Sequence, residues 1–131
     1  MRKEFHMPYT LAWEPKGVIK TFTGFVTGEE FVKSAEDVVL DERFNDSHYI
    51  VNDFLAISGH EIDAEKIQWV TSIRVGSHSF NSGLRVAILT TDADIMRIAK
   101  KTAPNDLPGA YETRAFETMQ QARQWLDSPP D

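Results

Sequence analysis

The sequence predicts an α/β domain of element order ββαβαβαβα, in which helices flank a mostly parallel sheet. Its hydrophobic pattern switches four times between the signals of strands and the three- to four-residue spacing of amphipathic helices. Two runs, "YIV" (49–51) and "LRVAIL" (84–89), are almost continuously apolar, which is typical of strands covered on both faces. Strands that alternate with helices of this length are joined by right-handed crossovers, so we expect parallel pairing.

An antiparallel strand is predicted at the N-terminal end of this sheet. Residues 9–14, "YTLAWE", place Tyr9, Leu11 and Trp13 on one face, and "VIKTFTGF" (18–25) is rich in β-branched and aromatic residues. The turn signal "PKG" separates the two runs. The two strands are therefore expected to form a hairpin.

The first helix is predicted within 27–44. Thr27 precedes Glu30 by three residues, which is the spacing of a capping box. One helical stripe then carries the apolar residues Phe31, Ala35, Val38 and Val39. The strand "HYIVNDF" (48–54) follows.

The remaining helices are predicted from cap residues and apolar stripes. Asp63 can cap a helix whose stripe includes Ile67 and Val70, and Thr118 can cap "MQQARQWL" (119–126). Thr91 and Asp94 have capping spacing before "IMRIAKK", the segment 74–83 is rich in turn residues, and "YETRAF" (111–116) has the composition of a strand.

Length and composition predict one domain over residues 1–131, with flexible ends at 1–7 and 127–131. The chain has 131 residues, of which 41% are hydrophobic and 26% charged, as in ordinary globular domains. No repeat or linker divides it. A homodimer is left open, because no heptad or charge pattern specifies a stoichiometry.

The charge inventory excludes several classes of function. A formal net charge of −6 opposes binding to nucleic acid or to anionic membranes, which calls for a basic face. Without cysteine there are no disulfides and no thiolate chemistry. No apolar run is long enough to span a bilayer, and no signal-peptide pattern opens the chain, so we expect a cytoplasmic protein that is not an integral membrane protein.

The densest ionisable group follows the strand that contains Asp53, at the carboxyl end where open α/β sheets place their sites. This candidate binding edge comprises Asp53, Ser58, His60, Glu61, Asp63 and, on the next helix, Trp69. Imidazole beside carboxylates can bind metal or transfer protons. The spacing of "HEID" opposes a metal site, however, because it straddles a predicted loop and helix start. We therefore expect no metal and no cofactor.

Three residues, His78, Trp69 and Ser58, bear on the function of this edge. His78 lies in a loop that enters a strand, so it is expected at the opposite edge of the sheet from His60. Trp69 lies to one side of its helix stripe and could anchor a partner or cover an apolar cleft. Ser58 lacks the strand-Gly-x-Ser-x-Gly-helix context of a nucleophile, so we expect no enzymatic activity; a hydrolase would need Ser58 or His60 for turnover.

The segments "FTGFVTGEEF", "YIVNDF", "LRVAILTTD" and "FETMQQARQWL", in this order, resemble the STAS/SpoIIAA-like family. They are most similar to its uncharacterised branch, often labelled STAS/SEC14. The resemblance implies a superhelix of βα turns. It also implies an acid at the end of the central strand, matched by Asp53, and a phosphorylatable Ser or Thr at the next helix start. That position falls near Ile62 and Asp63, which cannot take this role, so no phospho-serine switch is expected. Asp63 either caps its helix or imitates a permanently charged state.

Two functions remain open from the sequence. The first is a non-enzymatic STAS-like binding or regulatory module, which contacts an unidentified protein partner through the loop and helix after Asp53. The alternative, implied by the SEC14 resemblance, is a carrier of a small apolar ligand.

Overall fold

The computed structural model describes residues 9–77, 84–101 and 112–129. In chain order the elements are β1 (Tyr9–Glu14), β2 (Gly17–Val26), α1 (Gly28–Val39), the 3-10 helix η1 (Glu42–Asp46), β3 (Tyr49–His60), α2 (Ala64–Ser77), β4 (Arg85–Leu89), α3 (Ala93–Lys101), β5 (Glu112–Phe116) and α4 (Met119–Leu126). The predicted order ββαβαβαβα is confirmed, with η1 as an addition. His78 and the rest of 78–83 lie outside the described residues.

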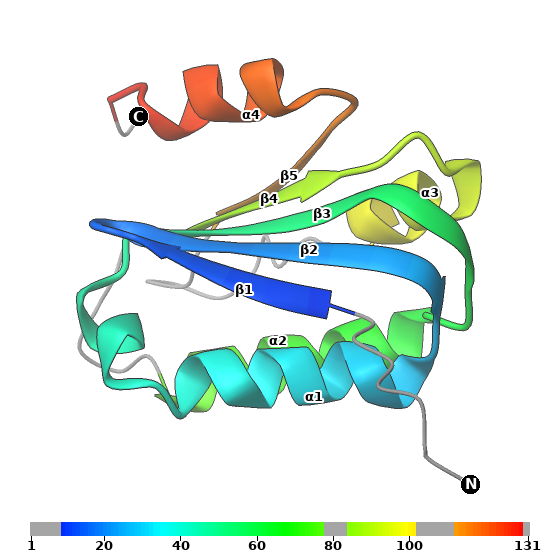
Figure 1. Ribbon diagram of the computed structural model, residues 1–131, viewed down its shortest axis with the longest axis horizontal. Coiled ribbons are helices and arrows are strands. Elements are labelled where there is room, and N and C mark those ends of the chain that lie inside the picture. Colours follow the sequence, from blue (N-terminus) through cyan, green and yellow to red (C-terminus); the bar gives the residue numbers. More distant parts are fainter. Residues whose placement is uncertain (1–8, 78–83, 102–111, 130–131) are drawn as a thin grey trace, which may run out of the picture.

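The five strands form one mixed sheet in the order β1-β2-β3-β4-β5. β1 pairs antiparallel with β2, and every later neighbour is parallel, as predicted. Figure 1 shows α1 and α2 side by side on one face of this sheet and α4 on the other. α3 joins α1 and α2, since its Ile95 and Ala99 pack into the same apolar cluster.

Aromatic stacking fills the core beneath α1. The rings of Phe22 and Phe54 stack with centroids 4.7 Å apart, and Phe31 of α1 lies 6.1 Å from Phe22. The predicted capping box holds the start of α1: Thr27 Oγ1 accepts from the Glu30 N–H, and a Glu30 carboxylate oxygen accepts from the Thr27 N–H. The cap fixes where α1 begins, and Phe31, one turn later, packs against the stacked rings.

Three helix boundaries differ from the prediction, and one is that α2 continues to Ser77, into the segment 74–83 that was predicted as rich in turns. α1 ends at Val39, because Asp41 accepts from the Arg43 N–H and starts η1, which buries Phe44 separately. The cap of α3 is Asp92 rather than Thr91: Asp92 Oδ1 accepts from the N–H groups of the second and third residues that follow it. Aspartate is the stronger N-cap of the two types, and the helix that it starts places Ile95 and Ala99 in the core cluster.

On the other face, Arg85 of β4 fastens the end of α4. Its guanidinium is almost buried and donates to the carbonyl oxygens of Trp125, Ser128 and Pro129, at 2.6, 3.0 and 3.1 Å. It also lies 5.2 Å from the centre of the Trp125 ring. A cation at a helix C-terminus satisfies carbonyls that the helix leaves unpaired. The tail was predicted to be flexible from residue 127; the arginine contacts its described part, and residues 130–131 lie outside the description.

Two polar side chains lie side by side in the core, because Lys20 of β2 pairs in register with Asn52 of β3. Each is 1% exposed. Lys20 Nζ donates to Ser34 Oγ at 3.0 Å and lies 5.2 Å from the centre of the Phe31 ring. Asn52 Oδ1 has no hydrogen-bond partner among the described residues, and it lies beside a core cavity of about 30 Å³.

Replacing Arg85 by methionine should lower the free energy of unfolding by about 2 kcal/mol, because charge-assisted hydrogen bonds to buried carbonyls are lost. Urea denaturation followed by circular dichroism measures the change. Arg97→Met is the matched control, since Arg97 is exposed and pairs with Asp94 on its own helix. Equal effects of the two variants would contradict the role of Arg85 in holding α4.

Asn52→Leu should leave the protein as stable or raise its melting temperature. A buried amide oxygen without a partner costs roughly 1–3 kcal/mol, and leucine has the same branched shape with no polar atom. Thermal unfolding by calorimetry checks this. A loss of more than about 1 kcal/mol would mean that the amide makes a contact essential to the core.

Candidate functional site

β3 is longer than predicted and does not end at Asp53. β4 accompanies it only as far as the pair Asp53↔Leu89, whereas β2 continues beside it to the pair Val26↔His60. Register shifts interrupt this two-stranded extension, and Gly24 there has a φ of 68°, as in a β-bulge. No third described strand pairs with the extension, several of its side chains are exposed, and its end, "SGH", was misinterpreted as part of a loop.

Three of the predicted site residues have local roles or none in this extension. Asp53 Oδ1 accepts from the N–H of Leu55 at 2.9 Å, which is a turn-like contact within the strand. Ser58 is exposed on the extension, and Glu61 is exposed just after it. The backbone N–H of Glu61 donates to the Val26 carbonyl oxygen at 2.8 Å, which closes the ladder between β2 and β3.

Asp63 caps α2, as the sequence predicted. Its Oδ1 accepts from the Lys66 N–H at 2.8 Å, and its carbonyl oxygen accepts from the Ile67 N–H at 3.1 Å. Beside it Ile62 is buried in the core cluster of α1, α2 and α3. The position near which the family resemblance implies a phospho-acceptor is therefore shared by a core residue and a helix cap.

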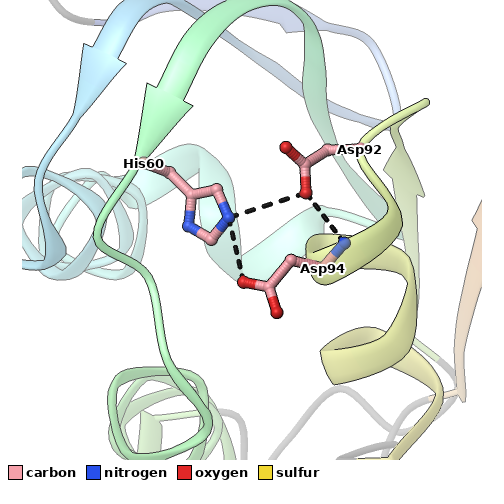
Figure 2. A group of neighbouring side chains, drawn as sticks. All are labelled: His60, Asp92 and Asp94. Atoms are coloured by element: carbon pink, nitrogen blue, oxygen red, sulfur yellow. Dashed lines mark hydrogen bonds and ion pairs between the residues drawn. The ribbon is translucent and has the colours of Figure 1, made fainter.

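His60 turns away from the other predicted residues and meets two acids at the start of α3. Figure 2 shows its ring directed at Asp92 and Asp94. His60 Nε2 lies 3.2 Å from Asp94 Oδ2 and 3.7 Å from Asp92 Oδ1, and the imidazole is 8% exposed. One ligand atom from each of the three residues lies within 4.8 Å of the others, so the group has the spacing of a metal site. Sequence reasoning had combined His60 with Glu61 and Asp63 instead.

The hydrogen bonds of the His60 ring oppose both metal binding and base catalysis. The backbone N–H of Ile62 donates to His60 Nδ1 at 2.9 Å, so Nδ1 must be the unprotonated nitrogen. In a neutral ring the proton then lies on Nε2, which is directed at Asp94. A metal on Nε2 would move that proton to Nδ1, against another donor. The group instead ties the end of β3 to the start of α3.

A second candidate surface lies between α1 and α2, about 680 Å³ in volume. Its lining consists of Glu29, Val32, Glu36, Glu65, Lys66, Gln68 and Trp69. We call it the α1/α2 groove. Trp69 is 58% exposed, in agreement with its predicted place beside the helix stripe. The stem of Lys66 lies against Gly28, where an added Cβ would come within 2.8 Å of Lys66 Cε. Of the six candidate residues, Trp69 alone lines this groove.

Two solved structures resemble this arrangement. One is the anti-sigma factor antagonist SpoIIAA in its unphosphorylated form. It matches with a TM-score of 0.62 and 9% sequence identity, and the match covers 92% of this chain and 99% of that chain. This chain has the SpoIIAA-like fold. An uncharacterised DUF3478 protein with a SpoIIAA-like fold from Shewanella loihica PV-4 matches with a TM-score of 0.56, 17% identity, and 96% and 98% coverage. No family model and no curated protein matches the sequence.

In this SpoIIAA-like domain a separate ion pair fastens β1 to α4, away from the α1/α2 groove. Arg123 donates twice to the Glu14 carboxylate, at 2.7 Å each, and Tyr49 donates its hydroxyl to the same carboxylate. These hydrogen bonds, that of Arg123 foremost, lower the pKa of Glu14 to about 2. The pair has an evident role in holding the sheet to α4.

Among the described helices, none combines the length and apolar character needed to cross a bilayer.

His60→Ala should lower the free energy of unfolding by about 1–3 kcal/mol, because the Ile62 N–H and the two acids lose their partner. The exposed His48 gives the control, His48→Ala, with a change within about 0.5 kcal/mol. Melting curves with and without added Zn²⁺ complete the test. If Zn²⁺ raised the melting temperature of the unmutated protein but not of His60→Ala, the assignment of the ring to a purely structural role would be wrong.

Proposed function

We propose that this protein is a non-enzymatic binding module that accepts a protein partner in the α1/α2 groove. The observation that carries the proposal is the exposure of Trp69, 58%, in the wall of a groove of about 680 Å³. A large aromatic side chain in a concave, partly apolar surface is the usual form of an interaction hot spot.

The fold supports a regulatory role of this kind. SpoIIAA is named for antagonising an anti-sigma factor, which is itself a protein, and it shares this architecture over most of both chains. At 9% identity the likeness extends to the fold. It makes protein binding a natural use of the scaffold and leaves the identity of the partner open.

The chemistry of the described residues supports a function without catalysis. His60, the nearest imidazole to the exposed Ser58 in sequence, is directed at Asp92 and Asp94, and its second nitrogen accepts from the Ile62 N–H. Neither nitrogen is available to take a proton from a nucleophile. A catalytic triad needs a base that is directed at its nucleophile, and His60 is directed at the two acids instead of Ser58.

The carrier of a small apolar ligand has less support. The core cavity beside Asn52 has a volume of about 30 Å³. An engineered protein cavity that binds benzene measures about 150 Å³. A ligand the size of a lipid chain would need the helices to separate from the sheet, whereas the α1/α2 groove is open as it stands. These volumes favour a partner on the surface.

The proposal predicts that a protein captured by the full chain from its native cells depends on Trp69. Trp69→Ala should reduce recovery of that protein at least about tenfold, as is common for a central aromatic anchor. Leu40→Ala is the matched control, because Leu40 is 82% exposed, apolar and not among the groove residues. Affinity capture with quantitative mass spectrometry compares the three forms. Recovery that is equal for all of them would reject the groove as the binding surface.

A further inference from the structure

We infer that the segment bound in the α1/α2 groove is a short amphipathic helix with an apolar face flanked by lysine or arginine. The inference rests on the proposed function and specifies the chemistry of the partner. Three observations carry it: the charge of the rim, the spacing of the lining residues along α1 and α2, and the helical surface on which the groove is built.

The charge of the rim calls for a cationic partner. Among the described residues, the lining includes three acids, Glu29, Glu36 and Glu65, and one cation, Lys66. The stem of Lys66 packs over Gly28 at the start of α1. The chain as a whole has a formal charge of −6, which has the same sign as this rim. A partner with cations at the same positions would be attracted over a distance and held in register.

The lining residues form one stripe along α1 and one along α2, so the groove is elongated along the two helices. On α1 the sequence acid, apolar, acid recurs at Glu29, Val32 and Glu36, three and four residues apart, which places all three on one stripe. On α2, Glu65 and Trp69 are four residues apart and form the opposite stripe. From Glu29 to Glu36 the groove runs for roughly 10 Å, so two to three turns of a bound helix would cover it.

The surroundings favour a helix over an extended strand or a second copy of this chain. A strand would add to a sheet edge, and the edges are β1 and β5, whereas this groove lies on helices. A third helix can pack into the groove between two others at 8–10 Å, the usual interaxial distance. A two-fold contact between two copies would set the glutamates of one groove against those of the other, which opposes self-association here.

The test uses synthetic peptides and the full chain. One peptide of about 18 residues places leucines at helical spacing between lysines; a second has the same composition in scrambled order; a third replaces every lysine by glutamate. Fluorescence anisotropy of the labelled peptides gives the dissociation constants. The lysine helix should bind at least about tenfold more tightly than either other peptide, and high salt should weaken it.

Variants locate the binding. Trp69→Ala and Glu36→Lys should each weaken the lysine helix about tenfold or more, with Glu36→Gln weakening it less than Glu36→Lys. Glu117→Lys is the matched control: it makes the same charge change beside α4, on the opposite face, and should leave affinity within about twofold. Unchanged melting temperatures establish that the variants fold.

The outcomes separate this inference from the proposed function. Equal binding of the ordered and scrambled peptides, or equal weakening by Glu117→Lys and Glu36→Lys, would overturn the inference. A captured cellular protein whose binding needs Trp69 but not Glu36 would also overturn the inference, while the proposed function would stand. If the lysine helix bound as expected but no cellular protein depended on Trp69, the inference about groove chemistry would hold and the proposed function would fail.

Discussion

The long parallel pairing of β2 with β3 is the constraint on which the rest of the domain depends. Both strands reach the same edge at the pair Val26↔His60. Because α1 and α2 each begin a few residues after this pair, they run back side by side across one face. Their proximity creates the α1/α2 groove. The same extension carries His60 beyond the end of β4, where it meets the acids that start α3. A shorter β3 would remove both features.

Most of the fold could be predicted because its signals are local. Continuous apolar runs identify strands covered on both faces, and the caps Thr27, Asp63 and Thr118 each accept from the N–H three residues later. The shift from Thr91 to Asp92 at α3 shows the limit of such signals. Thr91 and Asp92 are adjacent and both of a type that caps helices, so the sequence spacing alone did not identify which of them starts α3.

The candidate site was harder to predict, because its contacts join distant parts of the chain. The apolar run of residues 54–57 continues the strand locally, but Ser58, Gly59 and His60 are typical of a loop, and this part pairs with β2 alone among the described strands. The carboxyl ends of parallel strands meet at one edge of a sheet. Asp92 follows β4 at that edge and His60 ends β3 there, so their proximity could have been expected from the sequence. Trp69 could be singled out, since its place off the stripe is visible in sequence. Its neighbours on α1 could not, because they depend on how the two helices pack.

The two polar clusters differ in what they leave unsatisfied. Around His60 every ring nitrogen has a partner, and Asp92 also caps α3, so this edge is complete in the free protein. The α1/α2 groove is not: it exposes an indole to water, and its lining, as far as the structure describes it, has three glutamates and one lysine. Exposed apolar surface and like charges both raise the free energy of the unbound state. A partner that supplies both apolar area and cations lowers both of these free-energy costs, whereas a partner that supplies only one of them leaves the other cost in place.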